Sequence, residues 1–214
     1  MLPTVSFKEE LVNSITHGLG AVLGIGGTAV AIVWAALYGD AFSVVSASIY
    51  GAMLIILYVM STLYHAFTNK TAKKVFRIFD HCSIFLLIAG TYTPFTLCAL
   101  RGAFGWTIFG IIWGMTILGI VFNAISIEKF KIFSMVCYLV MGWLIIIAFK
   151  PLMDAIGFIP GTLLLLLGGI SYTVGIIFFA LKKIPYMHGI WHIFVLLGSV
   201  LHYFSVLFSA LPVR

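Results

Sequence analysis

Residues 185–192 read Pro-Tyr-Met-His-Gly-Ile-Trp-His and open the last apolar segment of the chain. They place His188 and His192 four residues apart. On an α-helix this spacing puts both imidazoles on one face, close enough to share an ion. Polar side chains inside an apolar segment of membrane length are costly, and they are usually retained for a function. We therefore expect a polar site at the start of this segment, completed by side chains from other segments.

The composition around this pair is that of an integral membrane protein. Of the 214 residues, 63% are apolar and 8% are charged, whereas soluble domains carry about 25% charged residues. The net charge of +6 comes from short loops between apolar runs. We interpret it as a topological signal and a contact with anionic lipids, and we expect no nucleic acid partner. The three cysteines form no C-x-x-C motif and indicate neither a disulfide framework nor a thiolate metal site.

The apolar runs predict an all-α fold with seven membrane-spanning helices, each near the ~20 residues that cross a bilayer. The predicted spans are residues 18–37, 43–64, 80–100, 104–125, 132–149, 162–181 and 186–207. Before them, residues 4–17 predict a short helix in the membrane interface, because it is too short and too polar to span. Ser6 and Glu9 fit a capping box at its start. We expect residues 1–214 to form one seven-helix membrane domain.

The basic residues predict how this bundle is oriented. With seven spans, nine of them would fall on one side of the membrane: Lys8, Lys70, Lys73, Lys74, Arg77, Lys129, Lys131, Lys182 and Lys183. Three would fall on the other side: Arg101, Lys150 and Arg214. Loops rich in lysine and arginine stay in the cytosol. The N-terminus is therefore expected in the cytosol and the C-terminus outside.

This topology brings other polar residues to the depth of the histidine pair. The second span would end in the cytosol at His65, with Ser61 one turn earlier on the same face. The third span would begin there with Asp80 and His81. Three helices would then present polar side chains to one layer. The topology was derived from the basic residues alone, so this agreement in depth is informative.

The residue types in this layer favour a metal. We expect His65, His188 and His192 to hold zinc, because three neutral imidazoles and a water make the open tetrahedral site of zinc hydrolases. The same ligands would accept nickel, cobalt or copper. Asp80 is the candidate base that takes a proton from the metal's water, and Ser61 could hydrogen-bond that water or a substrate carbonyl. A plainer interpretation, in which each histidine only hydrogen-bonds within the bundle, stays open.

Three other histidines lie outside this set. His17 and His81 are expected at the right depth but lack a same-face partner, so they could orient the ligands from outside. His202 comes ten residues after His192, roughly 15 Å deeper at 1.5 Å per residue. We interpret His202 as a structural residue.

Five segments spread over the chain carry a resemblance to a known family. They are Glu9-Glu10-x-x-Asn13-x-x-Thr16-His17-Gly18, Ser61-x-x-x-His65, Phe79-Asp80-His81, Gly90-Thr91-Tyr92-Thr93-Pro94-Phe95 and His188-x-x-x-His192. With them the chain resembles the bacterial hemolysin III proteins, which are grouped with the progestin and adiponectin receptors. The resemblance implies seven helices in the bacterial plasma membrane, a cytosolic N-terminus and a zinc ion on the cytosolic side.

The resemblance also assigns roles to single residues. It implies that His65, His188 and His192 are the zinc ligands. Asp80 matches the acidic residue near the metal water. Ser61 matches the serine of a wider group of membrane hydrolases that includes the alkaline ceramidases.

Two functions are open at this stage. The first is a zinc-dependent, ceramidase-like hydrolase acting on an amide or ester bond of a membrane lipid. The second is a non-enzymatic membrane protein, either cytolytic as the family name implies or a sensor with a structural zinc. No span shows the polar stripe of a pore-lining helix, which argues against a pore made by one chain. Direct ligation by Asp80 would favour structural zinc, since closed structural sites have four protein ligands.

Overall fold

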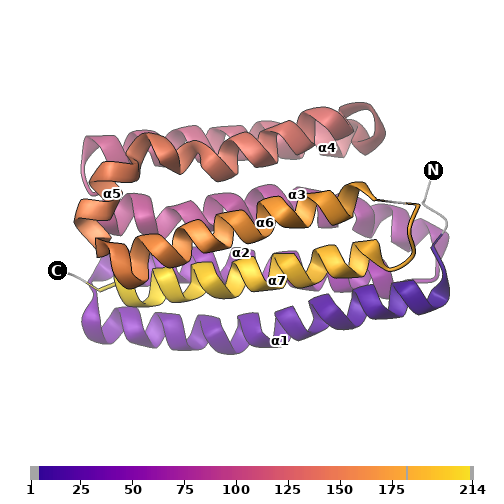
Figure 1. Cartoon of the computed structure of the whole chain (residues 1–214), viewed down its shortest axis with the longest axis horizontal. Coiled ribbons are helices and arrows are strands. Elements are labelled where there is room, and N and C mark those ends of the chain that lie inside the picture. The colour runs from indigo at the N-terminus through magenta and orange to yellow at the C-terminus, as the bar shows by residue number, and fades with distance from the viewer. Residues whose placement is uncertain (1–4, 182, 213–214) are drawn as a thin grey trace.

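The computed structural model describes residues 5–181 and 183–212, and these residues form helices without any strand. In chain order the elements are α1 (Phe7–Tyr38), α2 (Ala41–Ala66), α3 (Lys70–Pro94), η1 (Phe95–Ala99), α4 (Ala103–Trp143), η2 (Leu144–Ala148), α5 (Phe149–Ile156), η3 (Gly157–Thr162), α6 (Leu163–Ala180), α7 (Met187–Ser205) and η4 (Val206–Ala210). The helices run nearly parallel to the long axis of the molecule (Figure 1). Packing joins α1 to α2, α2 to α3, α3 to α4 and α6 to α7, and α1 also packs on α7.

Five helical segments in the described residues are long and apolar enough to cross a membrane. They are Phe7–Tyr38, Ala41–Ala66, Lys70–Ala99, Ala103–Ala180 and Met187–Ala210. The class of all-helical membrane protein is thereby confirmed. Five segments were found where seven spans were predicted, so the seven spans and the orientation stay predictions. Two of the basic residues behind the orientation, Lys182 and Arg214, lie outside the described residues.

The fourth of these segments is not one straight helix. Its backbone leaves the helical conformation at Ser126 (φ −167°, ψ 107°) and again at Ile159 (φ −116°, ψ 129°). Figure 1 shows α4 doubling back on itself, so that its two arms lie along one edge of the bundle. The breaks divide the longest apolar segment of the chain into three pieces.

The first helix differs from the prediction. A separate interfacial helix was expected over residues 4–17, of which residue 4 lies outside the described residues. Instead α1 continues unbroken from Phe7 to Tyr38. The separation was wrong because the polar residues of this segment do not end the helix: two of them, Asn13 and His17, are buried inside the bundle, 2% exposed each. The predicted capping box is confirmed: Glu9 N donates to Ser6 Oγ, and Ser6 N donates to the Glu9 carboxylate.

Side-chain caps begin the next two helices. Asp40 precedes α2 and accepts a hydrogen bond from Ser43 N at 3.0 Å. Arg101, in the turn before α4, bonds the other oxygen of this carboxylate. That hydrogen bond holds the pKa of Asp40 below its usual value. Asn69 caps α3 in the same way, because its side-chain oxygen accepts from Thr71 N and from Ala72 N. The caps fix where the helices start, and the start of α3 in turn sets the position of Asp80.

The contact between α3 and α4 depends on a glycine. The ring of Phe85 is fully buried, and a Cβ added at Gly119 would lie 2.3 Å from it. We expect Gly119→Ala to destabilise the protein by about 1–3 kcal/mol, the usual cost of overpacking a core. Gly114→Ala is the matched control, since a Cβ there meets nothing within 4 Å. Thermal unfolding in detergent measures both. Equal stability of the two variants would show that Phe85 moves aside without cost.

Candidate metal centre

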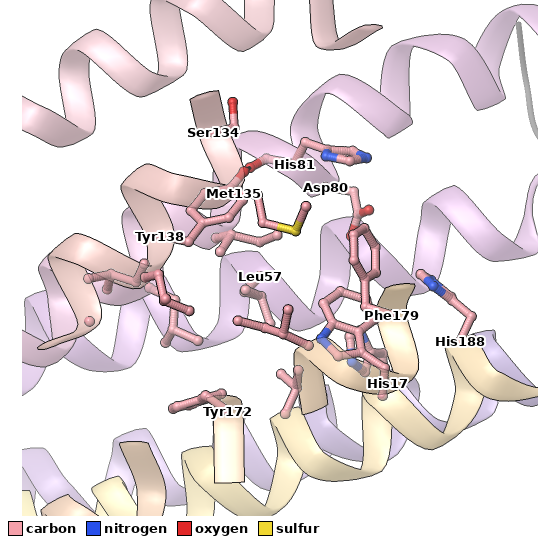
Figure 2. A pocket seen from close by; sticks show the side chains of 18 of the residues that line it. His17, Leu57, Asp80, His81, Ser134, Met135, Tyr138, Tyr172, Phe179 and His188 are labelled. Carbon is pink, nitrogen blue, oxygen red and sulfur yellow. Dashed lines mark hydrogen bonds between the residues drawn. The ribbon is translucent and has the colours of Figure 1, made fainter. Parts of the chain in front are cut away.

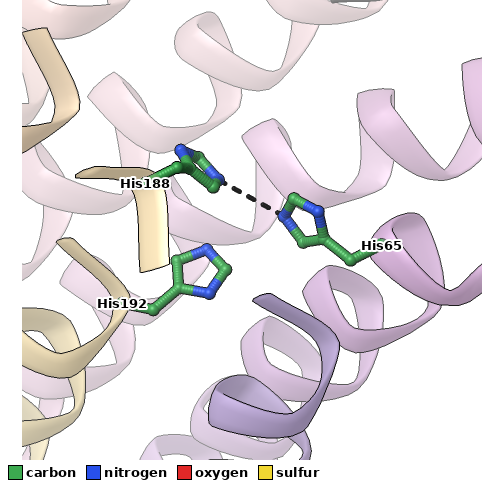
Figure 3. A group of neighbouring side chains, drawn as sticks. All are labelled: His65, His188 and His192. Atoms are coloured by element: carbon green, nitrogen blue, oxygen red, sulfur yellow. Dashed lines mark hydrogen bonds between the residues drawn. The ribbon is translucent and has the colours of Figure 1, made fainter. Parts of the chain in front are cut away.

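Three histidines from two helices meet at one end of the bundle. His65 lies in the last turn of α2, and His188 and His192 lie in the first two turns of α7. One ring nitrogen of each lies within 4.8 Å of the other two, and Figure 3 shows the three rings turned toward a common point. The Nε2 atoms of His65 and His188 are 3.3 Å apart. Two such nitrogens repel each other unless a proton or a cation lies between them, so this group could hold a metal ion.

The hydrogen bonds of His192 determine which of its two ring nitrogens carries the proton. Its Nδ1 lies 3.1 Å from the backbone oxygen of Asn13 and 3.1 Å from Thr16 Oγ1. Because a carbonyl oxygen only accepts, Nδ1 carries the proton and donates it to Asn13. The other nitrogen, Nε2, is then a bare acceptor. It is buried and has no hydrogen-bond partner within the described part of the chain.

A buried acceptor without a donor is unfavourable. A metal ion at the centre of the group would satisfy His192 Nε2 and would also separate the Nε2 atoms of His65 and His188. The donor set also fits, because neutral imidazole is the preferred protein ligand of zinc together with thiolate and carboxylate. The residues present therefore fit a metal.

Two side chains of α1, Glu10 and His17, contact the histidines of the group. Glu10 Oε2 lies 2.6 Å from His65 Nδ1, and Glu10 Oε1 lies 2.8 Å from Lys73 Nζ. The ring of His17 stacks on that of His192, with centroids 3.5 Å apart and an angle of 15° between the planes. An outer position was predicted for His17. A role for Glu10 was not predicted, although Glu10, Asn13 and His17 are spaced to share one helix face.

A cavity of about 360 Å³ reaches the cluster from the interior of the bundle. This is within the size range of small-molecule pockets. Asp80, His81, His188 and His17 lie on its wall (Figure 2). Deeper in, apolar and aromatic side chains of α3, α4, α6 and α7 line it, among them Ile88, Met135, Leu139, Ile176 and Val195. The charged side chains and most of the histidines are therefore at one end of the cavity. The rest of its wall is mostly apolar and aromatic, with a few polar side chains such as Thr91, Thr173 and His202.

The other residues singled out in the sequence, Asp80, Ser61 and His202, lie outside the group of three histidines. Asp80 is 9% exposed and lines the cavity, but it is not part of the group of three close ring nitrogens. Ser61 is buried in α2, and its Oγ has no hydrogen-bond partner among the described residues. It is not among the residues that line the cavity. His202 hydrogen-bonds the backbone oxygen of Leu165 at 3.0 Å, as expected of a structural residue.

The fold and the site together define an all-helical membrane protein with a buried histidine group at one end of its bundle and a cavity leading to it. Residues 5–203 match the family described as Haemolysin-III related. The chain belongs to this family, and it is a multi-pass membrane protein of bacteria.

Individual relatives agree with this assignment. The chain is 49% identical over 205 residues to Hemolysin-3 of Bacillus cereus, covering 96% of this chain and 93% of the relative. It is 48% identical over 208 residues to the Hemolysin-3 homolog of Bacillus subtilis, covering 97% of each. It is also similar to human monocyte to macrophage differentiation factor, at 29% identity over 206 residues, which cover 92% of this chain and 83% of that protein. No solved structure matches the chain.

Proposed function

We propose that the protein binds one zinc ion through His65, His188 and His192 and hydrolyses an amide or ester bond of a membrane lipid. The observation that carries this proposal is the convergence of three ring nitrogens, one of them a buried acceptor without a partner, at the polar end of an apolar cavity. An apolar cavity suits a substrate with an acyl chain. A polar end suits the bond to be cleaved.

In this proposal each part of the site has its own role in the reaction. Zinc held by three imidazoles supplies a Lewis acid and makes water nucleophilic near neutral pH. Asp80, on the cavity wall, takes the proton of the attacking water and later gives it to the leaving group. The apolar wall binds the acyl chain and keeps bulk water away from the bond. The hydroxyl of Ser61, one turn before His65, is buried without a hydrogen-bond partner among the described residues. Because Ser61 does not line the cavity, we assign its hydroxyl to the metal's water and not to the substrate carbonyl.

We further propose that the chain crosses the membrane seven times, with its N-terminus and the histidines on the cytosolic side. The two breaks at Ser126 and Ile159 support the seven crossings, because each lies between two predicted spans. The orientation rests on the distribution of lysine and arginine. In a variant without the native cysteines, Lys150→Cys should react with a membrane-impermeant thiol reagent on intact cells, and Lys74→Cys should react only after lysis. The reverse pattern would invert the orientation.

The second candidate is a non-enzymatic protein in which zinc is structural, acting as a sensor or in cytolysis. The relative from Bacillus cereus is named a hemolysin, which keeps this candidate open. The position of Asp80 favours the hydrolase. A structural zinc site is normally closed by four protein ligands, whereas the close group in the described residues consists of three histidines.

The test is elemental analysis of the purified protein together with assays on lipid amides and esters in detergent micelles. About one zinc per chain is expected. Fatty acid release, followed by mass spectrometry, should stop after chelation and return with added zinc. One zinc without release from any substrate would favour the structural candidate. No bound metal in a folded, monodisperse protein would overturn the proposal.

A further inference from the structure

We infer that the first turns of α1 position the metal centre, with Glu10 as a positioning residue for the ligand His65. This inference rests on the proposed metal binding. It gives a role at the site to a part of the chain that supplies no metal ligand itself. The amino-terminal turns of α1 contact both helices that carry the ligands, α2 through His65 and α7 through His192.

The contact between Glu10 and His65 selects one form of the imidazole. A carboxylate can only accept hydrogen bonds, so the bond of 2.6 Å to Glu10 Oε2 requires that His65 Nδ1 carries the proton. The lone pair then lies on His65 Nε2, the nitrogen that faces His188. A carboxylate behind a ligating histidine also fixes its ring orientation and makes it a stronger donor to the metal. Glu10 therefore acts on the metal through His65.

Lys73 keeps Glu10 in this position. Its ammonium group bonds the second carboxylate oxygen at 2.8 Å, and both side chains are largely buried, 12% and 13% exposed. The same ammonium lies 5.1 Å from the centre of the Tyr64 ring. Both oxygens of Glu10 are thus occupied, one by the ligand ring and one by a compensating charge. This arrangement suits an orienting group and not a direct ligand or a catalytic base.

The next turn of α1 repeats the arrangement for the second ligand helix. The backbone oxygen of Asn13 accepts from His192 Nδ1, which leaves His192 Nε2 for the metal. Two of the three ligands are therefore held in the same tautomer by one face of α1, once by a side chain and once by the backbone. The side-chain contact is the one that a substitution can remove, so Glu10 is the residue to test.

The experiment measures zinc affinity by competition with a chromophoric chelator for the wild type, Glu10→Gln, Glu10→Ala and Glu9→Gln. Glu10→Gln and Glu10→Ala should bind zinc about 10- to 100-fold more weakly, the usual effect of removing an outer partner of a ligand. Glu9→Gln is the matched control. It makes the same change of charge one residue away, and its side-chain oxygen can still accept from Tyr186 N as Glu9 does.

A second readout separates positioning from general stability. The metal-free Glu10→Gln protein should unfold at a somewhat lower temperature than the wild type, because Lys73 loses its counter-charge. The readout for positioning is therefore the further stabilisation by added zinc, which should be smaller in Glu10→Gln than in the wild type and unchanged in Glu9→Gln. The visible absorption bands of bound Co²⁺ should shift in Glu10→Gln and stay unchanged in Glu9→Gln. Wild-type affinity and bands in both Glu10 variants would overturn this inference and leave the proposed function standing. Absence of metal binding in the wild type would overturn both.

Discussion

Replacing His192 with alanine is expected to lower the zinc content of the purified protein from about one ion per chain to nearly none. His192 is fully buried, and its Nε2 is the acceptor without a partner at the centre of the group. Its removal leaves two histidines, which cannot complete the three-nitrogen site of a zinc enzyme. The affinity for zinc should fall by more than about 100-fold, because removing a residue that only orients a ligand already weakens metal binding by up to about 100-fold. Elemental analysis after dialysis measures the content.

The matched control for this prediction is His202→Ala, on the same helix. His202 is also a buried histidine, but its Nε2 bonds the backbone oxygen of Leu165 and it lies outside the group of three. The His202 variant should keep its zinc. Zinc retained in His192→Ala would remove this residue from the site. Loss of zinc from both variants together with aggregation would show that α7 had unfolded. Co²⁺ spectra of the soluble fraction would then decide whether His192 is a ligand.

The histidine group was predictable from the sequence for two physical reasons. The spacing of His188 and His192 places them on one helix face whatever the helix packs against. The positions of lysine and arginine then place His65 at the same end of the bundle. Both arguments need only periodicity and charge, and the distances among the three ring nitrogens agree with them.

The role of Glu10 was not predictable in this way. Its partner His65 is 55 residues away, and helix periodicity does not tell which neighbour a face will contact. Two charged residues, Glu9 and Glu10, near the start of a helix indicate an interface with water, yet Glu10 is largely buried. The separate helix at 4–17 was predicted because this segment is short and polar, but part of its polarity has another cause. Glu10 and Asn13 hydrogen-bond the histidines of α2 and α7 inside the bundle.

The two breaks in the longest apolar segment fall where the sequence predicts loops between spans. Ser126 lies between the predicted spans 104–125 and 132–149, and Ile159 lies between 132–149 and 162–181. Charged residues interrupt the apolar run near the first break, and Pro160-Gly161 adjoins the second. Hydropathy alone does not give the exact residue at which the backbone leaves the helix, since a turn changes the conformation of only one or two residues.

Replacing Asp80 with asparagine is expected to separate catalysis from metal binding. Asparagine has nearly the same shape but cannot take up a proton, so lipid hydrolysis should fall by about 10²- to 10⁴-fold, the typical contribution of a general base. Zinc content should stay at about one per chain, because Asp80 lies on the cavity wall outside the group of three ring nitrogens. Asp154→Asn is the control, since Asp154 lies in α5 and pairs with the exposed Lys150 one turn away.

The two readouts of the Asp80 variant discriminate between the candidate functions. Retained zinc with lost hydrolysis would support an open site whose fourth position is free for water. Loss of zinc together with activity would make Asp80 a fourth ligand when the metal is bound, and a site closed by four protein ligands would favour the structural role. Unchanged hydrolysis with unchanged zinc would assign the proton transfer to another group on the cavity wall, of which His81 is the nearest in the chain. The metal content of Asp80→Asn thus decides which of the two functions the same three histidines serve.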